Sequence, residues 1–476
     1  MCRVIALLSL LFLSSYSYSQ AFKVDRVKAD SSLYKSAFKI VREVKIIGNR
    51  TTKSQIIMRE LSFPLNDSIQ SEDFLDELEQ SRKNILNTSL FNFVRIDWAL
   101  DGPEEVLLVI NVQERWYIFP TPIFEIDDNN FNTWWEDKDY SRLNYGFHVI
   151  HNNFRGRKEK LTVTAQYGFT ERYRLRYEIP YINRKQKLGL RFNFSYNRRD
   201  QINYSSFDNE RLQYKSIEND ALRNLSGSVA LSYRKAIFSR HYLGLEFDQN
   251  RIRDSVRILN PNYLGNFRDR LKFLSLYYTF SRDLRDSRNY PLKGSFLNFQ
   301  IKKYGLGIID KSIDLTNLQL QYKKFWQLED RWFFASSFRG VMATNNNQPY
   351  LLQNGLGYNS FSIRAYEYYV IDGQNIGLFK AQFRYQLVKP NQAKLDFIPM
   401  DRFNKFHYAF YLGIFSDAAY VDDQTGFPMN GLANEIQFGY GIGLDFVTYY
   451  DVVIRTEYSF NKLGERGIFL HFVAPI

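Results

Sequence analysis

From Tyr117 to the C-terminus, apolar and polar residues alternate in one segment after another, the period-two pattern of β-strands. In residues 161–169, for example, the odd positions are Leu, Val, Ala, Tyr and Phe, whereas the even positions are Thr, Thr, Gln and Gly. The alternating segments are long, their polar faces carry many charges, and Tyr and Phe cluster near their ends. These features predict a membrane β-barrel with a lipid-facing exterior and a wet lumen. A soluble β-sandwich alternates in the same way and stays the alternative.

Counting the segments favours a closed barrel. Sixteen strands are expected, an even number, at residues 116–126, 143–153, 159–168, 172–182, 187–199, 224–235, 240–252, 270–283, 294–304, 312–326, 331–343, 376–387, 407–421, 435–447, 451–460 and 467–476. The long gaps at 127–142, 200–223, 253–269 and 344–375 then all fall at one end of the barrel. The exception is 388–406, which we expect to be a long turn at the other end.

Before the barrel, the pattern mixes helix and strand. Residues 40–49 predict a strand, and two short helices follow, one ending at Leu61 and one beginning at Ser71. Two alternating strands, at 94–100 and 106–112, complete a β-α-α-β-β order. The sequence therefore predicts a mainly β protein, a 16-stranded antiparallel transmembrane barrel preceded by one small α/β domain.

The N-terminus is typical of a secretory signal peptide. Arg3 precedes the apolar run 4–13, and Ser17 and Ser19 form a small-residue cleavage site before Gln20. A membrane-surface anchor is the alternative. We expect a signal peptide at 1–19, a linker at 20–38, the α/β domain at 39–115 and the barrel at 116–476. The single cysteine, Cys2, would leave with the signal peptide.

Composition narrows the class further. A mean hydropathy of −0.40 excludes a bundle of membrane helices, and 41 Phe and 34 Tyr fit aromatic girdles. The formal charge of +12 is expected to lie on lumen and loop residues rather than on a nucleic-acid-binding surface. We expect no catalytic constellation, no cofactor and no structural metal site; calcium binding by the paired loop acids Asp127/Asp128 and Asp422/Asp423 stays open as the alternative to solvated loops.

Three segments of the α/β domain carry a family resemblance: VKIIGNRTTKSQIIMREL (44–61), SRKNILNTSLFNFVRI (81–96) and VLLVINVQERWYIFP (106–120). They resemble the POTRA domain of the BamA/TamA family of outer-membrane assembly factors, also called bacterial surface antigens. The resemblance implies a single POTRA domain in the periplasm and a barrel in the outer membrane of a Gram-negative bacterium.

A motif in the gap 344–375 extends the resemblance. Ile363, Arg364, Ala365 and Tyr366 are similar to the (V/I)-R-G-(F/Y) motif of the family's sixth outer loop. The resemblance implies that this loop folds back into the lumen, where its arginine contacts acidic residues. A solvated loop arginine is the alternative.

Two candidate partners of Arg364 follow from the same resemblance. Asp417, in FSDAAYV (415–421), stands in the strand that supplies an acidic partner, and Gln382 stands where relatives often have Glu. Asp417 would then carry the ionic part of the contact alone. Ala365 replaces the usual Gly, so we expect its backbone not to adopt a positive φ easily.

The last strand should close the barrel against the first. It is expected to place Ile468, Leu470, Phe472 and Ile476 on the lipid face, with His471 inward. Pro475 donates no ladder hydrogen bond, so few bonds are expected at one end of this seam. The family resemblance implies that the seam opens and templates incoming strands.

The function expected from these features is assembly or translocation at the outer membrane. The resemblance implies unfolded outer-membrane or secreted client polypeptides as partners, besides outer-membrane lipids and possible periplasmic chaperones or accessory subunits; nucleic acid is not expected. Strand insertion, chain secretion and lipid movement stay open. A passive pore or structural barrel is the alternative, and no enzymatic activity is expected.

Overall fold

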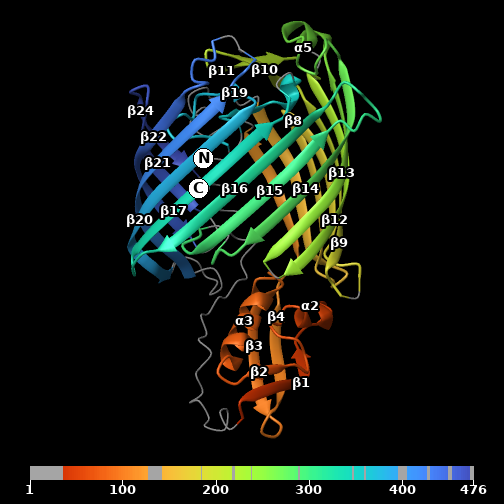
Figure 1. Cartoon of the computed structure of the whole chain (residues 1–476), viewed down its shortest axis with the longest axis vertical. Coiled ribbons are helices and arrows are strands. Elements are labelled where there is room, and N and C mark those ends of the chain that lie inside the picture. The colour runs from red at the N-terminus through yellow and green to blue at the C-terminus, as the bar shows by residue number, and fades with distance from the viewer. Residues whose placement is uncertain are drawn as a thin grey trace.

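The computed structural model describes residues 36–126, 142–183, 185–216, 220–236, 238–287, 290–345, 348–358, 361–394, 405–425, 429–448 and 453–471. The predicted signal peptide lies outside these ranges. The chain forms a small α/β domain and a large barrel, with the domain at one end of the barrel (Figure 1).

The α/β domain contains six elements: β1 (Phe38–Ile47), α2 (Ser54–Met58), β2 (Ser68–Gln70), α3 (Phe74–Leu86), β3 (Phe91–Leu100) and β4 (Glu105–Glu114). Its sheet has the order β2-β1-β4-β3, with β1 parallel to β4 and β3 antiparallel to it. Apolar side chains of the helices and the sheet share one core, which includes Ile56, Phe74 and Leu108. The predicted order of elements is present, and β2 is an addition because a strand of three residues leaves too short a pattern to recognise.

Within the described residues, sixteen strands form one antiparallel sheet in sequence order. Their bounds are β5 (Ile118–Ile126), β6 (Leu143–Phe154), β7 (Glu159–Gly168), β8 (Thr170–Ile179), β9 (Leu188–Arg199), β12 (Leu222–Ala236), β13 (Ser239–Ile252), β14 (Arg270–Asp283), β15 (Gly294–Tyr304), β16 (Leu315–Gln327), β17 (Trp332–Ala343), β20 (Asn375–Lys394), β21 (Lys405–Asp422), β22 (Ile436–Thr448), β23 (Val453–Asn461) and β24 (Arg466–His471). The predicted strand count is confirmed. A single continuous sheet that curls into a barrel, with strongly tilted strands, replaces the sandwich alternative (Figure 1).

The two faces of the sheet follow the predicted alternation. On β7, Thr162, Thr164 and Gln166 are buried on the lumen side, whereas Tyr167 is 41% exposed on the outer side. Large apolar side chains are exposed around the outside, among them Leu175, Phe194, Val229, Leu245 and Ile442. Such an apolar exterior is stable when lipid covers it. No helix in the described part of the chain is both long and apolar enough to cross a membrane.

The long connections gather at the end of the barrel away from the α/β domain (Figure 1). They contain the hairpin β10 (Gln201–Phe207) and β11 (Glu210–Lys215), the helix α5 (Asp254–Leu259), the 3-10 turn η3 (Tyr350–Leu352) and the short strands β18 (Asn354–Leu356) and β19 (Ile371–Gly373). The described parts of the long gaps therefore lie at the same end of the barrel, as predicted.

The expected long turn at 388–406 is wrong. β20 continues to Lys394 and β21 begins at Lys405, and the two pair from Asn391 opposite Tyr408 onward. The register shifts between Val388 and Asn391, the segment that contains Pro390. Because proline donates no ladder hydrogen bond, it is tolerated at such a bulge, and in the sequence it resembles the end of a strand.

The α/β domain docks on the turns of the early barrel strands. Tyr117 and Tyr181 join its core, and the backbone N–H of Lys53 donates to the carbonyl of Gly156 at 2.9 Å. At the centre of the contact, both oxygens of buried Glu60 accept from the guanidinium of Arg234, each at 2.9 Å. The ammonium of Lys158 lies 3.9 Å from the same carboxylate.

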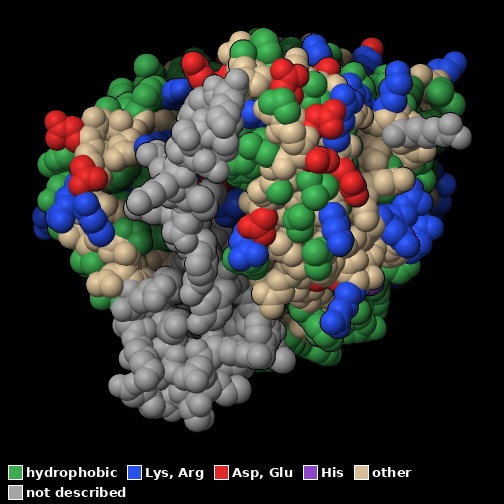
Figure 2. All heavy atoms as spheres, turned by 90° about the horizontal axis from the view of Figure 1, so that it is seen from below, with side chains coloured by type: hydrophobic (Ala, Val, Ile, Leu, Met, Phe, Trp, Pro, Cys, Tyr) green, Lys and Arg blue, Asp and Glu red, His purple; other side chains and the backbone are tan. Residues whose placement is uncertain are grey.

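Seen from below, the molecule shows Lys and Arg side chains interspersed with Asp and Glu (Figure 2). On the part of this face that is visible, the positive charge is not gathered into one patch.

Burial by itself raises the pKa of Glu60, but the hydrogen bond from Arg234 and the charges of Lys158 and Arg59 outweigh it and lower the pKa to about 2. An unfolded glutamate titrates near 4.5. The charged carboxylate therefore stabilises the docked domain fully above about pH 4.5, and this contribution is lost as the pH falls through about 2.

Replacing Glu60 by Gln should weaken this dock at neutral pH by about 3 kcal/mol, because it leaves buried cations without their counter-charge. Amide hydrogen exchange should then speed up in residues 52–60 and 153–158. Glu105→Gln removes the exposed pair with Arg42 (N–O distance 2.9 Å) and should leave exchange there unchanged. Equal exchange in both variants would show that the ion pair does not hold the dock.

Candidate functional site: a loop folded into the barrel

The chain between β17 and β20 turns back into the barrel instead of staying outside. Ile363, Arg364, Ala365 and Tyr366 are between 1% and 7% exposed. Their apolar neighbours include Val341 of β17, Leu378 of β20 and Val421 of β21, which form one buried cluster with Ile363 and Tyr366. We call residues 361–373 the lumen loop.

Arg364 and Asp417 lie together, as the family motif implies. Arg364 Nε donates to Asp417 Oδ2 at 2.9 Å and Arg364 Nη2 to Asp417 Oδ1 at 2.5 Å. The backbone N–H of Arg364 donates to Asp417 Oδ2 as well, at 3.1 Å. The guanidinium also stacks over the ring of Phe415, 3.9 Å from the centroid. A forked contact of this kind is among the strongest available to a buried cation.

Gln382 does not fill its expected role. It is buried, but its Oε1 accepts from Arg384 Nη2 at 3.0 Å, and Arg364 Nη2 instead points to the carbonyl of Ala381 at 3.5 Å. Residues two apart in a strand share a face, so Arg384 is the nearer donor.

The ionic contact is also not carried by Asp417 alone. Glu457 of β23 lies 3.5 Å from Arg364 Nη1, and Lys380 of β20 lies 3.7 Å from Asp417. Sequence reasoning missed Glu457. The alternation along β23 could have revealed it, because the inward-facing positions of this strand are polar: Arg455, Glu457, Ser459 and Asn461.

A second buried ion pair lies beside the first. Arg455 of β23 and Asp445 of β22 are directly opposite each other, and Arg455 Nε donates to Asp445 Oδ1 at 2.5 Å and Nη2 to Oδ2 at 2.8 Å. Tyr290, from the turn between β14 and β15, donates its hydroxyl to Asp445 at 2.7 Å. This contact draws the turn inward to the same wall of the lumen.

Ala365 corrects another expectation. Its φ is +70°, the left-handed conformation that we expected alanine to avoid. Its carbonyl accepts from Asn461 Nδ2 at 3.0 Å, and the residue before it is fixed by Asp417. Contacts on both sides hold a conformation that costs an alanine about 1 kcal/mol.

Gly439 of β22 lies directly beneath the loop. A Cβ built on this residue would stand 2.0 Å from the carbonyl oxygen of Arg364, a distance that no real side chain adopts. Gly439 therefore allows the backbone of the lumen loop to approach β22 closely.

The far end of the lumen loop is held by other connections. Asn209, in the β10–β11 hairpin, donates to the carbonyl of Val370 at 3.1 Å and to Asn430 Oδ1 at 2.9 Å. Ser206 donates to Asp372 Oδ2 at 2.5 Å and Tyr358 to Asp372 Oδ1 at 2.7 Å. The connections at this end thus form one hydrogen-bonded cap.

Glu367 continues the loop beyond Tyr366 and is 6% exposed. Its carboxylate lies 3.7 Å from Nε2 of His471 on β24.

The last strand places Ile468 (70% exposed) and Leu470 on the outer face and His471 on the lumen face. Phe472 and Ile476 of the predicted seam strand, and Pro475, lie outside the described residues. β24 and β5 are the two ends of the strand order, and the described residues show no pairing between them. We call this boundary the seam.

Comparison with known proteins decides the family. The Omp85 superfamily domain matches residues 153–448, more than half of the chain. The chain belongs to the Omp85 superfamily. The predicted resemblance to the BamA/TamA family is confirmed.

Individual relatives are distant. The Omp85 chain is 24% identical over 281 residues to a SAM50-like protein of Schizosaccharomyces pombe, a match that covers 56% of the chain and 54% of that protein. The chain therefore spans about half the length of this relative.

Solved structures share the fold. BamA from Haemophilus ducreyi lacking POTRA domains 1–3 is 15% identical, with 90% of this chain and 83% of that chain covered and a TM-score of 0.52. CdiB from Escherichia coli is 11% identical, with 92% and 74% covered and a TM-score of 0.55.

Replacing Gly439 by Ala should displace the lumen loop of the Omp85 protein, because a β-carbon there meets backbone. We expect a loss of about 2 kcal/mol in unfolding free energy and faster trypsin cleavage after Arg364. Gly377→Ala on β20 is the control, since nothing lies within 4 Å of its Cβ position. A Gly439→Ala protein as resistant as Gly377→Ala would contradict the close approach.

Replacing Ala365 by Gly should act in the opposite direction. Glycine adopts positive φ without the alanine penalty, so denaturant unfolding should report a gain of about 1 kcal/mol. Ala418→Gly, on neighbouring β21, should instead destabilise by about 0.5–1 kcal/mol, as glycine does within a strand. Losses of similar size at both positions would argue that Ala365 is not strained.

Proposed function

We propose that this Omp85 protein is an outer-membrane assembly or translocation factor, which inserts or transports client polypeptides through the seam. The observation that carries the proposal is the loop that fills the lumen of an Omp85 barrel. The lumen loop occupies the interior at β20–β23, while β5 and β24 end the sheet without pairing in the described residues.

The physical argument rests on unpaired backbone groups. In hydrocarbon, a strand edge without hydrogen-bond partners costs several kcal/mol per group, so an opened seam favours pairing with an incoming strand.

The α/β domain would act as a POTRA module in the periplasm. Its sheet ends in β3, an edge strand of ten residues, to which an extended client segment could add. The dock at Glu60 holds this edge at the barrel end where clients would arrive. We take residues 39–115 as this module, after a signal peptide at 1–19 and a linker at 20–38, and residues 116–476 as the barrel.

Clients would be unfolded outer-membrane or secreted polypeptides, with outer-membrane lipids around the barrel and periplasmic chaperones or accessory subunits as possible partners. The location would be the outer membrane of a Gram-negative bacterium, and neither an enzymatic activity nor a cofactor enters the proposal. A passive pore is the second candidate, but the buried loop and the hydrogen-bonded cap favour the first.

Closing the seam covalently tests the proposal. Cysteine pairs, one member in Ile118–Phe124 and the other in Arg466–His471, would be introduced and oxidised in cells depleted of the unmodified protein. We expect a fall in the amounts of other folded outer-membrane proteins, or of a secreted client, and recovery on reduction. The readout is a census of outer-membrane and secreted proteins.

The control is a cysteine pair at Asn298 and Gln321, which face each other on β15 and β16 away from the seam. This pair should leave the census normal. A normal census with the seam cross-linked would favour the passive barrel.

A further inference from the structure

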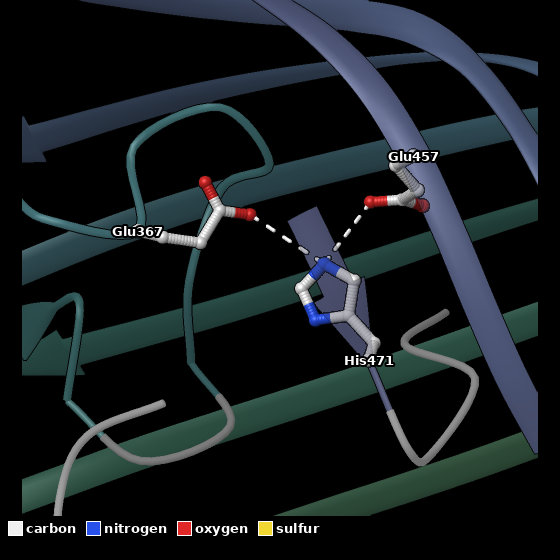
Figure 3. Close-up of side chains that lie close together, drawn as sticks. All are labelled: Glu367, Glu457 and His471. Atoms are coloured by element: carbon white, nitrogen blue, oxygen red, sulfur yellow. Dashed lines mark ion pairs between the residues drawn. The ribbon is translucent and has the colours of Figure 1, made fainter. Parts of the chain in front are cut away.

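Three side chains from separate parts of the chain meet beside the seam. Figure 3 shows Glu367 of the lumen loop, Glu457 of β23 and His471 of β24 converging on one point. His471 Nε2 lies 3.2 Å from Glu457 Oε2 and 3.7 Å from Glu367 Oε1. One donor atom from each residue lies within 4.8 Å of the other two.

The two closest of these atoms belong to one buried ion pair. Glu457 Oε1 faces Arg364 and Arg455, each at 3.5 Å, whereas Glu457 Oε2 faces His471 Nε2 at 3.2 Å. The side chain of Glu457 is fully buried and that of His471 is 20% exposed. A third oxygen, from Glu367, faces the same imidazole nitrogen, so two carboxylates and one imidazole share a single point.

The chemistry of the three groups fits a divalent transition metal. Imidazole nitrogen and carboxylate oxygen are ligands of Zn²⁺, and donors about 2.1 Å from a tetrahedral ion lie about 3.4 Å apart. The two separations at His471 are close to this value, and small side-chain rotations would complete the set. We propose that Glu367, Glu457 and His471 form a zinc-type metal site with one position open to water.

This site would join the lumen loop to β23 and β24, two strands that already pair with each other through their backbones. A bound ion would tie the lumen loop and β23 to β24, the strand at the seam. If the seam acts as proposed above, occupancy of the site would fix the position of β24, one of its two edges. That consequence rests on the proposed function, whereas metal binding itself does not.

The test uses the purified, tag-free full chain in detergent, stripped with a chelator and titrated with Zn²⁺. We expect saturable binding of one ion per chain, a visible Co²⁺ spectrum of low coordination number, and a metal-dependent rise in the unfolding midpoint. His471→Gln and Glu367→Gln should each weaken affinity by about tenfold or more. Heat-modifiable gel migration would verify that each variant is folded.

His148→Gln is the matched control, because His148 also lies on a barrel strand but contacts Thr164 rather than a carboxylate. Its affinity for Zn²⁺ should equal that of the unchanged protein. Absence of saturable binding, or equal affinity in the folded His471→Gln protein, would overturn the site. Because this measurement requires no client, its failure is distinct from a failure of the seam experiment.

Discussion

The interior of this barrel depends on the burial of one positive charge. A guanidinium removed from water loses several kcal/mol of hydration, and only a paired and fully hydrogen-bonded environment returns it. Arg364 obtains that environment from Asp417, the ring of Phe415 and the carboxylate of Glu457. Since these partners come from β21 and β23, the loop must enter the lumen to satisfy its arginine. The ion pair therefore determines the path of the whole connection between β17 and β20.

The contact between Arg364 and Asp417 also constrains the backbone of the lumen loop and of β22. For the guanidinium to reach Asp417, the loop backbone must lie against β22, and only glycine at position 439 leaves the space. The chain then reverses at Ala365 with a positive φ. A strained alanine persists there because Asn461 and Asp417 hold the peptide groups on each side. Local strain is thus offset by the charge contact that it makes possible.

The sequence alone predicts the positions of the strands well and the side-chain contacts inside the lumen poorly. Alternation has a period of two and depends only on which face meets lipid, so all sixteen strands can be recognised without knowledge of their neighbours. The partners of Arg364 depend instead on which inward-facing residues of different strands lie at the same height along the barrel axis. That height is set by the stagger between strands, which the alternation does not contain. The family motif predicts the contact of Arg364 with Asp417. It predicts neither the contact with Glu457 nor the hydrogen bond between Gln382 and Arg384.

The same limit explains the error at 388–406. A proline at a register shift resembles a strand end in sequence, and only the pairing of β20 with β21 distinguishes the two. Conversely, nothing in the sequence distinguishes Glu60 from an ordinary glutamate at the end of a helix. Its hydrogen bond with Arg234 is visible only in the folded structure. Charged residues whose partners lie far away in the chain are thus where sequence reasoning fails.

The two sets of buried charges hold different halves of the barrel. The dock at Glu60 attaches the α/β domain to turns of β6–β9 and to β12, in the first half. The lumen loop, through Arg364, is attached to β21 and β23 in the second. The seam lies between these halves, at the junction of β5 and β24, and among the described residues no ion pair of either set joins these two strands. If the seam opens as proposed, both charge clusters would therefore stay intact.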